Sequence, residues 1–355
     1  MKRSAPTPKF EKDVAFRDEA QFVQWLRRRW PARATGLRLG IGDDAALVRP
    51  ARGRDLVLTT DLSVEGVHFR PDLHPARSIG HRALARALSD LAAMGARPRF
   101  ALLSLSIPRT TRRSWISAFY DGFGTLARSL GVTLIGGDTA VTASGPVMAD
   151  VVAIGEVGRD QALHRRGAQP GDGVYVTGRL GLSALGLALL DYKKRAARGV
   201  LAANLLAPDR RAALQAHLYP EPRCRVGMNL VRRGLASAAI DVSDGFARDL
   251  GRLCDASGCG ATIWEDHLPL VELNEARNPR LRPLELGLYG GEDYELLFTV
   301  PQSRFSQVPR AMGGVALHRI GEIRGGHGLT LLGRGGVGLP IESRGYDHFR
   351  QPDRI

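Results

Sequence analysis

The chain has 355 residues, enough for about two domains that each bury a core, and its 44% apolar and 24% charged residues are ordinary for a soluble globular protein. No apolar run approaches the roughly 18 residues of a membrane-spanning helix, and no apolar segment of a signal peptide follows the basic N-terminus. Three cysteines, all in the second half, favour a reducing cytoplasm over a disulfide framework. These numbers exclude an integral membrane protein and predict a cytoplasmic one with no membrane partner.

The net charge of +14 suggests a nucleic-acid-binding protein, but the distribution of the charges argues against it. The arginines are spread along the whole chain, and no recognisable nucleic-acid-binding motif accompanies them. A positive field also draws anionic small molecules toward a cleft. We therefore expect no nucleic-acid partner. The acidic residues, which gather in glycine-rich motifs, are the feature that needs an explanation.

In the first half of the chain, strands and helices alternate, and acidic motifs follow several predicted strands. A basic and flexible tail is expected over residues 1–15. The strand at 55–58 runs into Thr59-Thr60-Asp61, and the strand at 132–135 runs into Gly136-Gly137-Asp138. This order predicts an α+β fold of α/β sandwich layers for an N-terminal domain over 16–158. The apolar spacing predicts helices at 17–29, 78–94 and 115–130, and strands at 55–58, 100–107, 132–135 and 147–157.

A segment rich in arginine, glycine and proline, at 158–173, predicts the boundary to a C-terminal α/β domain over 159–350. Asp241 and Asp244 follow a short apolar strand in this domain, and Ser243 or Asp244 is expected to cap the helix after it. The predicted helices lie at 182–197, 208–222, 225–234 and 244–256, and the predicted strands at 174–178, 238–240, 260–264 and 295–300.

The carboxylates and hydroxyls at the ends of these elements indicate a site for metal ions and phosphate. Carboxylates repel phosphate groups, so a phosphate binds beside them only through cations, and Mg²⁺ prefers oxygen ligands. Phosphoryl transfer from ATP to an anionic substrate requires mainly positioning and charge neutralisation. The motifs of P-loop, serine-hydrolase, zinc-protease and protein-kinase sites are absent. The candidate metal ligands are Asp44, Thr59, Thr60, Asp61, Asp90, Asp138, Asp241 and Asp244.

Two basic side chains near these motifs are candidates for substrate contact. Arg165 lies in the segment between the predicted domains and can pair bidentately with a phosphate; the alternative is a solvated linker charge. His68 lies on a loop after Asp61. A lone histidine is more often structural than functional, but its place beside these motifs favours a substrate contact.

The long motifs, taken in order, resemble those of the thiamine-monophosphate kinase family over roughly residues 16–350. The wider superfamily includes aminoimidazole ribonucleotide synthetase and selenophosphate synthetase. The motifs that carry the resemblance are Gly40-Ile41-Gly42-Asp43-Asp44-Ala45, Thr59-Thr60-Asp61 with Glu65-Gly66-Val67-His68-Phe69, Leu88-Ser89-Asp90-Leu91-Ala92-Ala93-Met94-Gly95, Gly136-Gly137-Asp138-Thr139, Ile240-Asp241-Val242-Ser243-Asp244-Gly245, Gly290-Gly291-Glu292-Asp293-Tyr294 and Gly345-Tyr346-Asp347-His348-Phe349.

The resemblance implies that ATP phosphorylates thiamine monophosphate to thiamine diphosphate by direct in-line transfer, with several Mg²⁺ ions and no covalent catalytic residue. It implies the two-domain fold of aminoimidazole ribonucleotide synthetase and a homodimer whose N-terminal sheets pair into a barrel. The implied metal ligands are the eight residues given above. The implied ATP contacts are Gly137, Asp138, Arg165, Ser243 and Tyr120, and the implied contacts to thiamine monophosphate are His68, Glu292 and Tyr346.

Other functions remain open. Composition alone does not exclude an enzyme like aminoimidazole ribonucleotide synthetase, although the stretch 61–69 and the tail 345–349 favour the thiamine substrate. A selenophosphate synthetase is expected to carry a reactive cysteine near its N-terminus, whereas the first cysteine here is Cys224. A non-enzymatic polyanion-binding protein would use the +14 charge but leaves the acidic motifs unexplained.

Overall fold

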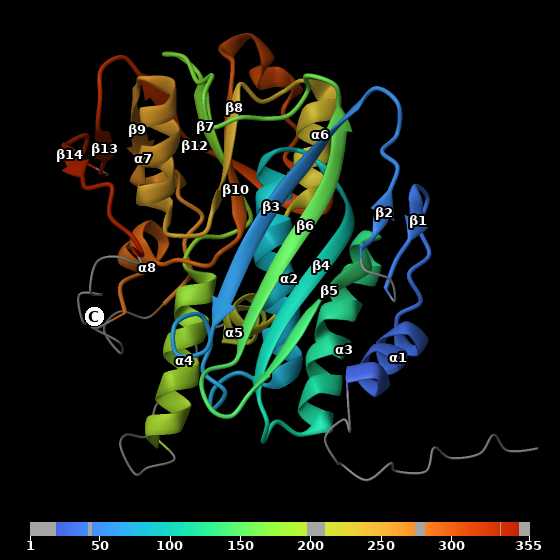
Figure 1. The fold of residues 1–355 in the computed structure, drawn as a ribbon. Coiled ribbons are helices and arrows are strands. Elements are labelled where there is room, and N and C mark those ends of the chain that lie inside the picture. Colours follow the sequence, from blue (N-terminus) through green and yellow to red (C-terminus); the bar gives the residue numbers. More distant parts are fainter. Residues whose placement is uncertain (1–18, 42–44, 197–209, 274–280, 334, 348–355) are drawn as a thin grey trace, which may run out of the picture.

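The computed structural model describes residues 19–41, 45–196, 210–273, 281–333 and 335–347 (Figure 1). The predicted N-terminal tail and the turn that contains Asp44 lie outside the described residues. Among the described residues, no helix combines the length and the apolar character needed to cross a membrane.

A four-stranded sheet organises the N-terminal part, and helices cover one of its faces (Figure 1). Helices α2 (Ala76–Ala93) and α3 (Arg113–Leu130) pack against this face, and α1 (Glu19–Arg29) packs on α3. The two short strands β1 (Leu37–Leu39) and β2 (Leu47–Val48) pair separately. The strand order is β3 (Arg54–Val64), β6 (Met148–Gly158), β4 (Arg97–Pro108), β5 (Thr133–Thr142), and only β4 and β5 are parallel.

Two of these strands run further than the sequence patterns predicted. β3 does not end before Thr59-Thr60-Asp61, and β5 does not end before its Gly-Gly-Asp motif, because strand pairing continues through both. Successive side chains of a strand point to opposite faces. Thr59 and Asp61 therefore face the helices, whereas Leu58, Thr60 and Leu62 lie on the open face of the sheet.

Helices α2 and α3 approach each other closely because each has a glycine at the contact. A Cβ on Gly80 would lie 1.9 Å from the carbonyl oxygen of Phe119, and one on Gly122 would lie 1.8 Å from that of Arg77. Both distances are far below van der Waals contact, so any side chain there would push the helices apart. α2 is thus held tightly over the sheet.

A second, mixed sheet forms the C-terminal part. Helices of this part are α4 (Leu182–Ala196), α5 (Arg210–Leu218), α6 (Cys224–Arg233), α7 (Phe246–Ser257) and α8 (Pro283–Tyr289), with short 3₁₀ turns at Glu265–His267 and Gln302–Gln307. The strand order is β14 (Gly338–Ile341), β13 (Leu329–Leu332), β9 (Gly260–Trp264), β12 (Val315–Arg324), β7 (Gly173–Thr177), β10 (Glu295–Val300), β8 (Ala238–Val242), and β11 (Ala311–Met312) pairs with β12.

The larger hydrophobic core joins the two parts. It includes Leu88 and Leu91 of α2 together with Leu296 and Phe298 of β10, and α2 also contacts α6 and β8. α2 therefore lies between the two sheets and contacts strands of both. The division of the chain near residue 158 stays a prediction.

Candidate active site

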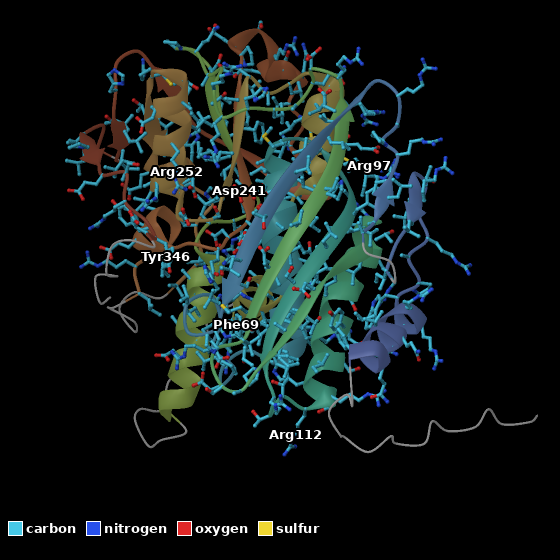
Figure 2. The ribbon with its side chains drawn as sticks, viewed as in Figure 1. Phe69, Arg97, Arg112, Asp241, Arg252 and Tyr346 are labelled. Carbon is cyan, nitrogen blue, oxygen red and sulfur yellow. The ribbon has the colours of Figure 1, made fainter. Side chains whose placement is uncertain are left out.

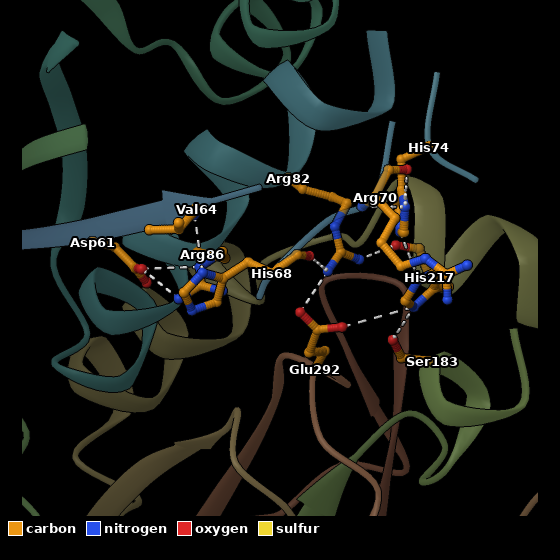
Figure 3. Close-up of polar contacts among 10 residues, drawn as sticks. All are labelled: Asp61, Val64, His68, Arg70, His74, Arg82, Arg86, Ser183, His217 and Glu292. Carbon is orange, nitrogen blue, oxygen red and sulfur yellow. Dashed lines mark hydrogen bonds and ion pairs between the residues drawn. The ribbon is translucent and has the colours of Figure 1, made fainter. Parts of the chain in front are cut away.

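Three charged side chains on successive turns of α2 define the axis of the candidate site. Arg82, Arg86 and Asp90 are four residues apart, so they share one helix face at intervals of about 6 Å. Arg82 Nη2 lies 2.5 Å from Glu292 Oε1, and Arg86 Nη2 lies 2.6 Å from Asp61 Oδ1 (Figure 3). α2 thus connects two of the sequence motifs, one from each part of the chain.

At the C-terminal end of α2, Asp90 and Asp241 bring two carboxyl groups together in a buried place. Thr59 Oγ1 donates a hydrogen bond of 2.5 Å to Asp90 Oδ2, and Ser89 Oγ donates one of 2.7 Å to Asp241 Oδ2. Burial raises the pKa of both carboxyl groups, and the neighbouring carboxylates raise it further. The structure thus places two carboxyl groups where their charged forms are costly, and a bound cation would relieve that cost.

Arg165 lies near this pair although its own side chain is exposed. Its charge partly offsets the raised pKa of Asp90 and of Asp241, which places the guanidinium within electrostatic reach of both. An exposed arginine beside carboxylates is suited to bind a phosphate group that cations also bind. The role of Arg165 in ATP binding stays a prediction.

The turn after β8 is organised by a residue that the sequence patterns did not single out. Asp249, fully buried on α7, accepts hydrogen bonds from the backbone N–H groups of Ser243 (3.0 Å) and Asp244 (2.9 Å). The expectation that Ser243 or Asp244 caps α7 is wrong, because Gly245 is the N-cap and makes no side-chain cap bond. Arg252 Nη1 lies 2.7 Å from Asp244 Oδ2 and so holds that carboxylate in place. Figure 2 marks Asp241 on β8 and Arg252 on α7.

Two predicted metal ligands lie on the other face of the N-terminal sheet. Thr60 Oγ1 donates a hydrogen bond of 2.7 Å to Asp150 Oδ1, and Asp138 is exposed on β5. Cross-strand pairing puts Leu62, Asp150 and Asp138 in one row on the open face. Gly137, next to Asp138, has φ +146°, and a Cβ there would lie 1.9 Å from the carbonyl oxygen of Leu103 on β4. Among the described residues, Thr60 and Asp138 therefore lie on the face of the sheet opposite to Thr59 and Asp61.

Arg82, Arg86 and Asp90 form a stripe of charged side chains along α2. At the Arg82 end of this α2 stripe, Glu292 is held by basic and polar groups. Besides its pair with Arg82, its Oε2 lies 3.8 Å from Nδ1 of His217. Burial alone would raise the pKa of Glu292, but the neighbouring positive charges, that of Arg82 foremost, lower it to about 2. Glu292 also has φ +66°, an uncommon conformation for a residue with a side chain. The carboxylate is therefore ionised at neutral pH and fixed in direction.

The two other predicted substrate residues lie near this end. The Val64 N–H donates to His68 Nδ1 at 3.0 Å, and the His68 carbonyl oxygen accepts from Arg82 Nη2 at 3.3 Å. Tyr346 donates its backbone N–H to the Asp244 carbonyl oxygen at 2.8 Å. Burial raises the pKa of the Tyr346 hydroxyl, and the charges of Asp244 and Glu292 raise it further. Their contacts with substrate stay predictions.

Tyr120 lies in a different environment from the one expected for a nucleotide contact. Its side chain is only 2% exposed and packs edge-on against Phe22, Trp25 and Phe119, with Trp30 beside it. Phe22 and Trp25 of α1 cover it, and its contact with ATP stays a prediction. Asp44, by contrast, lies outside the described residues.

Arg82 and Arg86 are the residues that the sequence reasoning missed. Arg82 is 3% exposed, and besides Glu292 it donates to the carbonyl oxygen of His217 on α5. A signal was present in the sequence, since both arginines interrupt the apolar residues of α2 at positions in register with Asp90. Arginines at such buried positions require partners.

The residues present suit a hard divalent cation, although they do not form a complete site. The donor atoms are carboxylate and hydroxyl oxygens, the ligands that Mg²⁺ prefers. No group of three or more acidic, histidine or cysteine side chains suited to a metal ion forms within the described part of the chain, from which Asp44 is missing. Asp61 and Asp244 are paired with Arg86 and Arg252. In this structure, both carboxylates therefore face an arginine in place of a cation.

Comparisons with known proteins agree with this geometry. Residues 42–157 match the family model of the AIR synthase related protein N-terminal domain, and residues 169–334 match that of its C-terminal domain. The hydrogenase maturation protein HypE, at 22% identity and TM-score 0.69, shares the fold.

Relatives of higher sequence identity identify the family within this fold. The chain is 40% identical to the thiamine-monophosphate kinase of Salmonella typhimurium, over 88% of this chain and 92% of that one, and 36% identical to that of Bacillus subtilis, over 88% and 94%. The crystal structure of the Stenotrophomonas maltophilia thiamine-monophosphate kinase matches with TM-score 0.71 at 38% identity, over 87% and 94% of the two chains. AaThiL complexed with AMPPCP and TMP matches with TM-score 0.71 at 30% identity, over 93% and 97%. The chain belongs to the thiamine-monophosphate kinase family.

Proposed function

We propose that this chain catalyses transfer of the γ-phosphoryl group of ATP to thiamine monophosphate (TMP), with Mg²⁺ bound at the acidic end of α2. A phosphate oxygen of TMP forms a bond to the γ-phosphorus, the bond from that phosphorus to the β–γ bridging oxygen breaks, and ADP leaves with the electron pair. The attacking oxygen is already ionised at neutral pH, so no strong general base is required.

The observation that carries this proposal is the arrangement along α2. Asp90, with Asp241, lies at one end of this row of side chains, and Arg82, which pairs with Glu292, lies at the other, about 12 Å away by helix rise. Glu292 remains ionised and can attract the positive thiazolium ring of TMP. The phosphate of a TMP molecule whose ring lies at Glu292 then extends toward the carboxylates, where the nucleotide phosphates would lie.

The residues that would hold Mg²⁺ in this chain are Thr59, Thr60, Asp61, Asp90, Asp138, Asp241 and Asp244, together with Asp44. A bound Mg²⁺ supplies charge neutralisation for the phosphate groups. Arg165 adds a positive charge beside the same carboxylates, and Gly137 and Ser243 offer backbone and hydroxyl groups to the nucleotide.

We also propose that the chain acts as a homodimer whose N-terminal sheets pair. Leu58 and Leu62 on the open face are 61% and 49% exposed, on an edge strand. Such an apolar face is costly in water and is typical of an interface. Asp138 lies three strands from Asp61, about 14 Å at ordinary strand spacing, and on the opposite face. A second copy can supply to one site the ligand that its own chain places too far away.

The decisive test is a coupled assay that measures ADP release by the purified chain with Mg-ATP and either TMP, thiamine or the aminoimidazole ribonucleotide precursor. Of the three acceptor substrates, we expect only TMP to give ADP. We expect no ADP with TMP after removal of divalent ions with EDTA. ADP formation no greater than in an ATP-only control would contradict the proposal. Turnover of the aminoimidazole precursor would instead indicate the related synthetase activity.

A further inference from the structure

Arg86 occupies the middle of the α2 stripe, between the two ends of the proposed site. Asp90 follows it by one turn on the carboxylate side, and Arg82, which holds Glu292, precedes it by one turn. Each step corresponds to a helix rise of about 6 Å. Figure 3 shows the Asp61–Arg86 pair at the left of the close-up and the Arg82–Glu292 pair near its centre.

The Arg86 side chain is largely buried, and its pair with Asp61 uses only part of its donor set. Nε and Nη2 both donate to the same oxygen, Asp61 Oδ1, at 2.9 and 2.6 Å. Nη1 and Asp61 Oδ2 take no part in this pair. A guanidinium offers five N–H donors in a plane, so the group can accept a further anion from the side of Nη1.

The positive charge of Arg86 acts on both ends of the site. On the carboxylate side it offsets the raised pKa of Asp61 and Asp90. On the other side it lowers the pKa of Glu292 and opposes the raised pKa of Tyr346. The guanidinium therefore lies within electrostatic reach of groups that the proposed function assigns to the metal ions and to the thiamine ring.

The acceptor phosphate has to lie between these two ends, where several carboxylates would repel it. A buried cation with spare donors at that point is suited to hold it, because arginine binds phosphate with paired, charge-assisted hydrogen bonds. We propose that Arg86 is a phosphate-binding residue for the acceptor substrate. It donates to the phosphate of TMP and thereby gives up part of its hold on Asp61, whose oxygens become available to a cation. This inference rests on the proposed function.

The test compares kinetic constants of Arg86→Gln and Arg86→Lys with those of the wild-type chain. We expect Arg86→Gln to raise KM for TMP roughly ten- to a hundredfold, the usual cost of a lost hydrogen bond to a charged group. KM for ATP, and the inhibition constant of thiamine, which lacks the phosphate, should stay within about twofold. Arg86→Lys keeps the charge without the paired donors, so its KM for TMP should lie between those of the wild-type chain and Arg86→Gln.

Arg99→Gln is the matched control. Arg99 Nη1 pairs with Glu156 Oε2 at 2.7 Å, and its side chain is 15% exposed against 14% for Arg86. This variant loses an equivalent arginine–carboxylate pair on β4 and should leave KM for TMP unchanged. Thermal melting of all variants checks that they are folded.

Two results would overturn the inference: no change in KM for TMP, or a parallel rise in KM for TMP and in the inhibition constant of thiamine. A wild-type chain that forms no ADP with TMP would contradict the proposed function instead. Calorimetric titration of TMP and of thiamine into the wild-type chain and Arg86→Gln then decides the inference alone, because only a phosphate-binding residue affects TMP selectively. Equal loss for both ligands, or no loss, refutes it.

Discussion

At the scale of single residues, the site places carboxylates in two contrasting electrostatic environments. Asp241 is buried beside other carboxylates, and burial and this repulsion raise its pKa. Glu292 pairs with Arg82, and the neighbouring positive charges, that of Arg82 foremost, lower its pKa to about 2 despite burial. A cation would stabilise the ionised form of the first carboxyl group, whereas the second is already ionised. This contrast favours metal ions at one end and the thiazolium ring at the other.

Glu292→Gln tests the role of this negative charge. The amide keeps the size of the side chain and one acceptor oxygen for Arg82, but it loses the negative charge that attracts the thiazolium ring. We expect KM for TMP to rise by about tenfold, which corresponds to about 1.4 kcal/mol, with KM for ATP unchanged. Steady-state kinetics with each substrate varied measures both constants. Glu285→Gln, on the exposed surface of α8, is the control. An equal rise in both Michaelis constants would assign Glu292 a structural role only.

At the scale of elements, the sequence predicted which strands and helices carry the motifs but not where the strands end. Thr59, Thr60 and Asp61 were expected to follow a strand, yet Leu58, Thr60 and Leu62 continue its alternation, and that pattern was readable. The pairs Arg86–Asp61 and Arg82–Glu292 were not predictable, because they join residues 25 and 210 positions apart through the packing of α2. The confirmed fold class and family were predictable from local motifs, whereas the ion-pair partners of Arg82 and Arg86 depend on tertiary packing.

A buried histidine pair joins α5 to the loop before α2. The Arg70 N–H donates to His74 Nδ1 at 3.1 Å, and the two Nε2 atoms of His74 and His217 lie 2.9 Å apart. The short Nε2–Nε2 contact has room for one proton, which either ring can donate to the other, and His217 Nδ1 lies 3.0 Å from Ser183 Oγ. Both rings are neutral in this arrangement. Burial, together with the charge of Arg82, lowers the pKa of His217 to about 3 and also lowers that of His74.

This pair makes the stability of the fold depend on pH. Between the ordinary histidine pKa near 6.5 and the lowered value near 3, the unfolded chain binds protons that the folded chain excludes. The free energy of unfolding should therefore fall as the pH is lowered through this window, by up to about 1.4 kcal/mol per pH unit for each histidine. His217→Gln should show a flatter dependence, measured by urea denaturation between pH 4 and 7.5. Parallel curves for both proteins would contradict this account.

At the scale of the whole molecule, the separation of Asp61 from Asp138 predicts active sites that combine residues of both chains of the dimer. The two residues lie on edge strands and opposite faces of one sheet. If each site combines Asp61 of one chain with Asp138 of its partner, a mixed dimer of Asp61→Asn and Asp138→Asn contains one intact site. Each variant alone should be inactive. After unfolding and refolding together, the mixture should regain about a quarter of wild-type activity, since half of the dimers are mixed and each has one of two sites.

The matched control for this experiment is the pair Asp61→Asn and Asp90→Asn. Both residues lie on the helix-covered side of the same chain, where Arg86 and Thr59 hold them. Mixed dimers of these two variants contain no intact site and should stay inactive. Light scattering of the refolded mixtures verifies that dimers formed. Recovery in the control, or no recovery with Asp138→Asn, would show that Asp61 and Asp138 do not act together across the dimer. The exposed leucines of β3 would then require another partner.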